Sequence, residues 1–241
     1  MKPITYLSMN GIRTPSEDYT WVDGSEDWGA SQNPPIRFVK EEYDERGTVA
    51  RWVWEDDRAD RLAAEMDRKA PTVFVGHSYG CKLGLLAANI ANVPPRELHL
   101  VSGAFPTDST ASGLNEYLIR NPTAKAFIYR GGADWVLSKV APKTRFARWL
   151  ARGAEAVVRG ATLGWANPSF ARKVGYDSGG AVQPVAAYGI EPSVARRVWF
   201  RDRPEFGHSD FLNSENLPGL LSLITGVGER LGVIQINAGG A

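Results

Sequence analysis

The chain contains few of the residues that bind metals or cross-link proteins. Its 241 residues include one cysteine, Cys81, which excludes an intramolecular disulfide and a cysteine-rich metal site. Only three histidines occur, and no C-x-x-C or H-E-x-x-H spacing is present. We therefore expect neither a catalytic metal nor another cofactor. Cys81 itself is expected to be a small, buried apolar residue.

Long apolar runs and a large net charge are also missing. No stretch is long and apolar enough to span a bilayer, and the N-terminus runs straight into a strand rather than into the apolar core of a signal peptide. The formal net charge of +1 argues against nucleic acid as the main partner and favours a small or neutral substrate. We therefore expect a cytoplasmic protein, and the oligomeric state stays open.

Short apolar segments alternate with helical patterns along the whole chain. At 43% hydrophobic residues the chain can bury a large core, and we expect one domain, 1–241. The alternation predicts an α/β fold with a mostly parallel six-stranded sheet and helices on both faces. The predicted strands are Ile4–Ser8, Ile36–Lys40, Thr72–Val75, Leu98–Ser102, Ala126–Arg130 and Arg197–Arg201. The predicted helices are Ser25–Ala30 with Ser25 as its N-cap, Glu55–Lys69, Tyr79–Ala91, Ser112–Arg120, about 143–159, and Ser214–Leu231.

The most informative motif is G-x-S-x-G at Gly76-His77-Ser78-Tyr79-Gly80. It directly follows the continuous apolar run Thr72–Val75, which is typical of a central parallel strand, and it precedes a helical pattern. A sharp turn from strand to helix lifts a serine hydroxyl clear of the sheet. The glycines Gly76 and Gly80 let neighbouring backbone pass without Cβ clashes. Five residues alone are a weak signal, but this context predicts that Ser78 is a nucleophile.

A nucleophilic serine needs a base, and three histidines are available. His77 adjoins Ser78, so its side chain leaves the turn in a different direction. His99 lies inside a predicted strand and is expected to be a core or face-polar residue. His208 follows the last predicted strand on a loop, from which it can reach across the carboxyl edge of the sheet. We therefore predict His208 as the base.

The base in turn needs a carboxylate that fixes its tautomer. Asp134 follows the strand Ala126–Arg130 through two glycines and is the favoured candidate. Asp108, after the preceding strand, stays open as an alternative, although its surroundings also fit a helix N-cap. Asp210 is too close in sequence to His208 to be preferred.

The order of these residues, Ser78, then Asp134, then His208, resembles the α/β-hydrolase superfamily over nearly the whole chain. The resemblance implies that the first two strands of the family are absent. It also implies an oxyanion hole made by the backbone N–H of Tyr79 and one from the loop after the first strand here, at Gly11 or Ile12. The chain departs from the family's common His-Gly pair there, because Asn10 precedes Gly11.

The longest excursion follows the predicted acid. The resemblance places a lid between the two strands that follow the serine. In this chain that interval, Phe105–Lys125, has little more than one helix, and the sequence instead predicts a helical insertion at 135–192, a possible cap or lid. Basic residues interleave with apolar ones over 139–173. Two interpretations stay open: a surface helix packed on the sheet, or a lid that contacts an anionic membrane surface or an acidic substrate.

These features predict a serine hydrolase that cleaves a small carboxylic ester through an acyl-enzyme. A thioesterase, peptidase or acyltransferase of the same fold would use the same groups. A third alternative is a protein of this fold that binds a ligand without catalysis.

Overall fold

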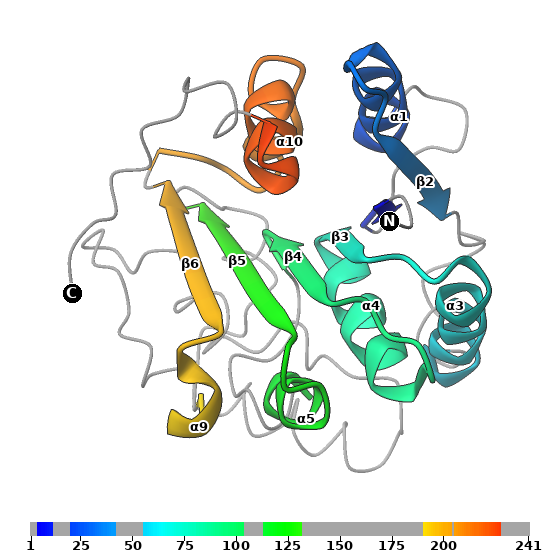
Figure 1. The fold of residues 1–241 in the computed structure, drawn as a ribbon. Helices are drawn as coiled ribbons and strands as arrows, with labels where there is room; N and C mark the ends of the chain where they lie inside the picture. Colours follow the sequence, from blue (N-terminus) through cyan, green and yellow to red (C-terminus); the bar gives the residue numbers. More distant parts are fainter. Residues whose placement is uncertain are drawn as a thin grey trace.

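The computed structural model describes residues 4–11, 20–41, 55–103, 113–131, 190–203 and 205–227. Six strands form one sheet in the order β2-β1-β3-β4-β5-β6, and all neighbouring pairs are parallel (Figure 1). The strands are β1 (Thr5–Met9), β2 (Arg37–Glu41), β3 (Val73–His77), β4 (Glu97–Val101), β5 (Lys125–Gly131) and β6 (Val198–Arg203). Each predicted strand is confirmed, with ends that differ by one or two residues.

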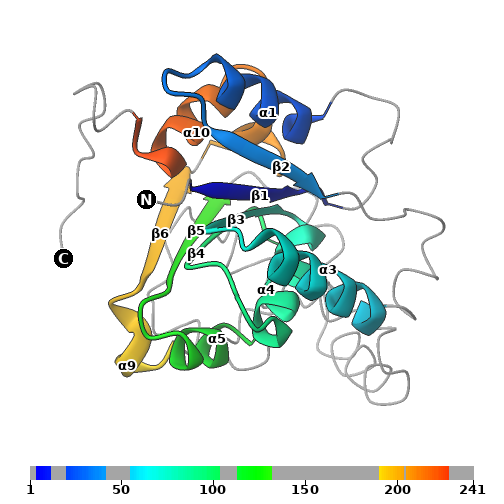
Figure 2. The ribbon, with the colours of Figure 1, turned by 45° about the vertical axis from the view of Figure 1, so that its right-hand side comes forward.

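Helices lie on both faces of the sheet, as predicted. One face is covered by α3 (Glu55–Lys69), α4 (Tyr79–Ile90), α5 (Leu114–Arg120) and α9 (Pro192–Ala195). The other face is covered by α1 (Trp21–Ser31) and α10 (Leu217–Thr225), which lie on the opposite side of the sheet (Figure 2). A short 3-10 helix, η3 (Asp210–Leu212), precedes α10.

The two faces of the sheet bury two separate apolar clusters. All five residues of β1 and of β3 are buried, because both of their faces are covered. The cluster under α3, α4 and α5 contains Leu7, Phe74, Leu83, Leu85, Leu98 and Leu100. The cluster under α1 and α10 contains Tyr6, Val75, Val101, Tyr129, Phe211 and Leu221. In a sheet covered on both faces in this way, ligand sites lie in the loops beyond the carboxyl ends of the strands.

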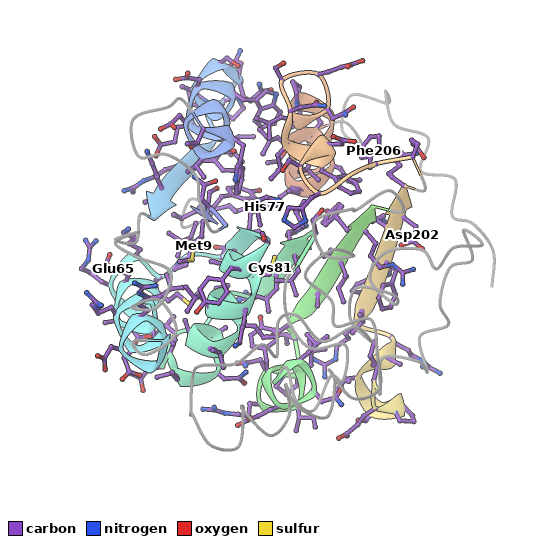
Figure 3. The ribbon with its side chains drawn as sticks, turned by 180° about the vertical axis from the view of Figure 1, so that it is seen from behind. Met9, Glu65, His77, Cys81, Asp202 and Phe206 are labelled. Carbon is purple, nitrogen blue, oxygen red and sulfur yellow. The ribbon has the colours of Figure 1, made fainter. Side chains whose placement is uncertain are left out.

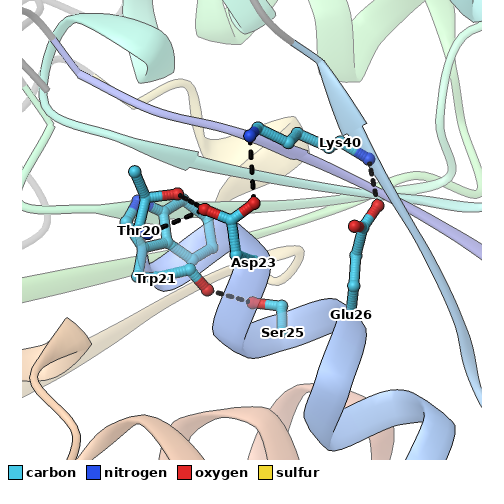
Figure 4. Close-up of polar contacts among 6 residues, drawn as sticks. All are labelled: Thr20, Trp21, Asp23, Ser25, Glu26 and Lys40. Atoms are coloured by element: carbon cyan, nitrogen blue, oxygen red, sulfur yellow. Dashed lines mark hydrogen bonds and ion pairs between the residues drawn. The ribbon is translucent and has the colours of Figure 1, made fainter. Parts of the chain in front are cut away.

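The first helix begins earlier than predicted. α1 starts at Trp21 with Thr20 as its N-cap, so the prediction that Ser25 caps it is wrong. Ser25 lies inside the helix and its hydroxyl donates to the Trp21 carbonyl at 2.8 Å. The Asp23 carboxylate accepts hydrogen bonds from the Thr20 N–H and hydroxyl, both at 2.7 Å (Figure 4). The sequence signal that identifies this start is a threonine three residues before an aspartate.

The Asp23 carboxylate also links α1 to β2, the edge strand of the sheet. The Lys40 ammonium group on β2 lies 3.0 Å from Asp23, and the Lys40 N–H donates to Glu26 at 3.1 Å (Figure 4). Burial acts to raise the pKa of Asp23, but the hydrogen bonds from Thr20 and the charge of Lys40 outweigh burial and lower it to about 2. Asp23 is therefore ionised at neutral pH.

Several predictions concern residues that are not described. The structure does not describe Ile12, Asp108, Asp134, the helix at about 143–159, the basic segment 139–173 and nearly all of the insertion 135–192.

The last helix is shorter than predicted. α10 ends at Thr225 rather than at Leu231, since Gly226 adopts a left-handed φ of 67°. In the part of the chain that the structure describes, no helix is long and apolar enough to cross a membrane.

Candidate active site

Ser78 occupies a sharp turn between β3 and α4. Its backbone has φ 52° and ψ −122°, a conformation that costs a non-glycine residue about 1–3 kcal/mol. The Ser78 N–H donates to the Val101 carbonyl at the end of β4 at 3.0 Å. This bond and the buried surroundings hold the strained turn in place. The serine is therefore presented at the carboxyl edge of the sheet, as the G-x-S-x-G motif predicts.

The two glycines of the motif lie where the backbone is crowded. A Cβ at Gly80 would lie 2.5 Å from the Asn10 carbonyl oxygen, and one at Gly76 would lie 3.0 Å from the Cys81 nitrogen. Cys81 is buried, and its thiol donates to the Gly76 carbonyl at 3.1 Å. Burial raises the pKa of this thiol, so Cys81 remains protonated. The prediction that Cys81 is a buried structural residue is confirmed.

His208 is in contact with the serine. Its Nε2 atom lies 2.9 Å from Ser78 Oγ, although 130 residues separate the two in sequence. His208 lies on the loop between β6 and η3. The Asp210 carboxylate accepts the Gly207 N–H at 2.7 Å, which closes that loop. The loop also packs on the end of β5, where a Cβ at Gly131 would lie 2.3 Å from the Phe206 carbonyl oxygen.

His77 contacts the backbone of His208 rather than Ser78. It is the last residue of β3, at the carboxyl edge of the sheet (Figure 3). Asp202 on β6 and Phe206 in the loop after β6 lie at the same edge. The His77 Nε2 atom lies 3.1 Å from the His208 carbonyl oxygen. A carbonyl oxygen only accepts, so Nε2 carries the proton and donates. Burial lowers the pKa of His77 to about 3, with a further contribution from the charge of His208, so His77 is neutral at physiological pH.

His99 is a buried histidine of the core, as predicted. Its Nδ1 atom lies 2.9 Å from the Tyr129 hydroxyl, and its ring stacks on Phe127 with centroids 4.6 Å apart. Burial lowers the pKa of His99, although the Glu97 carboxylate at 3.7 Å acts in the opposite direction. His99 therefore has partners of its own, and the structure does not bring it to Ser78.

Backbone from two elements flanks the serine. Tyr79 is the first residue of α4, so its N–H lies at the amino end of that helix, beside Ser78. Gly11 follows β1, and a Cβ there would lie only 2.6 Å from Ser78 Cβ and 3.2 Å from the His77 carbonyl oxygen. The loop that the resemblance implies for the oxyanion hole thus reaches the serine at Gly11. Ile12, the other candidate in that loop, lies outside the described residues.

A buried ion pair joins the two strands that lead to the predicted acid and base. The guanidinium group of Arg130 on β5 donates two hydrogen bonds to the Asp202 carboxylate on β6. The Arg130 side chain is 2% exposed and lies over the Phe200 ring, 4.5 Å from its centroid. Asp134 follows β5 in sequence, and His208 follows β6. Arg130 and Asp202 are also direct partners in the register of these two strands.

Metal ligands do not gather in the described part of the chain: no group of three or more His, Cys, Asp or Glu side chains there could hold an ion.

The carboxylates that the sequence proposes as the acid, Asp134 and Asp108, both lie outside the described residues. Asp210 is described, and it bonds the backbone N–H of Gly207.

The strand order, the strand–serine–helix turn and similarity to solved structures together define an α/β-hydrolase fold. The esterase domain of a Rhodothermus marinus protein is 11% identical with a TM-score of 0.52, over 95% of this chain and 88% of that one. Arabidopsis thaliana SOBER1 is 12% identical with a TM-score of 0.50, over 93% and 98%. An uncharacterized protein from Bacillus cereus ATCC 10987 is 10% identical with a TM-score of 0.51; the match covers 95% of this chain but 59% of that one. No family model and no curated protein matches the sequence.

Proposed function

We propose that the protein is a serine hydrolase that cleaves a carboxylic ester through an acyl-enzyme. The observation that carries the proposal is the 2.9 Å contact between Ser78 Oγ and His208 Nε2, made on a strained turn at the carboxyl edge of the sheet. A binding protein of this fold needs neither a strained serine nor a histidine beside it. The contact therefore favours catalysis over ligand binding alone.

In the proposed reaction, Ser78 attacks the ester carbonyl while His208 Nε2 takes the hydroxyl proton. The N–H groups of Tyr79 and of Gly11 or Ile12 stabilise the oxyanion, and one such donor contributes about 3 kcal/mol of barrier lowering. The tetrahedral intermediate expels the alkoxide, which receives the proton from His208. Water, activated by His208, then cleaves the acyl-enzyme and releases the acid. Asp134 stabilises the imidazolium form of His208.

The ester is chosen among several acyl substrates. Thioesters, amides and acyl transfer to another acceptor would use the same groups, so a substrate series has to separate them. One solved structure of the same fold is called an esterase domain, which makes simple esters the first substrates to test. Turnover of p-nitrophenyl acetate compared with an acyl thioester of equal chain length measures the preference.

Labelling with a fluorophosphonate probe tests the activated serine directly. We expect rapid labelling of the wild type, none of Ser78→Ala, and labelling slowed by several orders of magnitude in His208→Ala. His99→Gln is the matched control, because His99 makes its contacts away from Ser78 and should label at the wild-type rate. Equal labelling of the wild type and Ser78→Ala would refute the proposal. A loss in His99→Gln without one in His208→Ala would refute the choice of base.

The acid is tested by a pair of isosteric variants. Asp134→Asn should lower kcat for an activated ester by about 10³-fold or more while the fold stays intact, because the amide fixes the wrong tautomer of His208. Asp108→Asn should leave kcat within a few-fold of the wild type. The opposite pattern would move the acid to the loop after β4. Circular dichroism of both variants checks that the fold is unchanged.

A further inference from the structure

We infer that His77 is a positioning residue for the proposed reaction: its buried ring holds the backbone of His208 so that the His208 imidazole meets Ser78. The inference depends on the proposed function. It concerns a residue that the sequence placed next to the nucleophile without assigning it a role.

The end of β3 positions both proposed catalytic groups. His77 is the last residue of β3 and is joined to Ser78 by a peptide bond, so the serine is fixed to it covalently. Its Nε2–H donates to the carbonyl of His208 at 3.1 Å, and the two rings lie 4.9 Å apart, centroid to centroid. The bond ends on the backbone of His208 itself. It therefore fixes the point from which the His208 side chain reaches Ser78 Oγ.

The other side of the His77 ring faces the loop proposed for the oxyanion hole. A Cβ at Gly11 would lie 3.3 Å from His77 Nδ1, so backbone and ring are near contact. The ring thus lies between the loop after β1 and the loop after β6. Side chains of similar size could fill this space, but only one with a donor at the position of Nε2 can bond the His208 carbonyl. Loss of this hydrogen bond removes a restraint on the backbone of His208, and we expect the loop after β6 to shift as a result.

His77 is also suited to its neighbour by being uncharged. In the proposed reaction His208 becomes an imidazolium, and a second positive charge 4.9 Å away would oppose that step. Burial keeps the neutral form of His77, whose pKa is about 3. The ring therefore supplies a hydrogen-bond donor beside His208 without a charge.

Two variants of similar size separate the effect of the hydrogen-bond donor on His77 from the effect of its side-chain volume. His77→Gln places an amide N–H at about the reach of Nε2, whereas His77→Met has similar length and no donor. We expect His77→Met to lower kcat for p-nitrophenyl acetate by about 10- to 100-fold with KM changed less than twofold, since a shift of about 1 Å of a catalytic group costs about 10²-fold. His77→Gln should recover most of that loss. Equal kcat in the wild type and His77→Met, or equal losses in both variants, would overturn the inference.

Nitrogen-15 NMR of the wild type gives a test that does not need activity. The chain has only three histidines, so each ring can be assigned from a single substitution. We expect His77 to appear as the Nε2–H tautomer without titration between pH 5 and 8. An Nδ1–H tautomer, or titration in that range, would overturn the inference even if the variants do not fold. Failure of the proposed function reads out differently, as equal probe labelling of the wild type and Ser78→Ala.

Discussion

The contact between Gly11 and Ser78 makes the sharpest prediction about the oxyanion loop. In Gly11→Ala, the new Cβ would lie 2.6 Å from Ser78 Cβ, whereas carbon atoms in contact are about 3.5–4.0 Å apart. Both carbons are fixed directly to backbone, so no side-chain rotation relieves the overlap. The loop or the serine turn must therefore move by about 1 Å.

A displacement of this size should reduce activity more than stability. A shift of about 1 Å costs about 10²-fold in rate, which is about 2.7 kcal/mol of barrier. We expect Gly11→Ala to lower kcat/KM for p-nitrophenyl acetate and the rate of fluorophosphonate labelling together by about this factor. The circular dichroism spectrum should stay that of the wild type.

The control is the same substitution at an exposed glycine of α10. A Cβ at Gly219 meets no atom within 4 Å, so Gly219→Ala should leave the rate unchanged and stabilise the helix by up to about 1 kcal/mol. If Gly11→Ala labels and turns over ester at the wild-type rate, the loop after β1 does not lie against the reacting serine as described. The proposed oxyanion hole would then be wrong.

Two further predictions concern stability. Arg130→Met should lower the free energy of unfolding, measured by urea titration, by about 3–5 kcal/mol, because it leaves the Asp202 carboxylate without its ion-pair partner. The double variant Arg130→Met/Asp202→Leu should recover most of that stability. An Arg130→Met variant as stable as the wild type would contradict the prediction. The folded pKa of His77, about 3, lies below its unfolded value of about 6.5, so the unfolded chain binds the extra proton and stability falls as pH drops from 6.5 toward 3. His77→Gln should remove up to about 1.4 kcal/mol of this loss per pH unit, measured between pH 6.5 and 5, whereas an unchanged slope would mean that His77 is not buried in its neutral form.

Local sequence patterns determined the strands, most helices and the serine turn. Strands buried on both faces are typically near-continuous apolar runs, and Thr72–Val75 shows this pattern without reference to the rest of the chain. Alternation of strands and helices requires a parallel sheet, and in such a sheet the loops after the strands share one edge. That rule alone placed Ser78 and the loop of His208 at the same edge, before any contact was known.

Tertiary packing decided what local patterns do not encode. The Thr20–Asp23 pair that starts α1 is a local signal, but the ion pair of Asp23 with Lys40 on β2 forms only in the folded chain. The link from His77 to the His208 carbonyl joins residues 131 positions apart. The sequence shows that His77 stands beside the serine, but a backbone carbonyl leaves no trace in sequence as an acceptor. Only the folded chain, with the loop after β6 closed over the end of β3, brings that carbonyl to the ring.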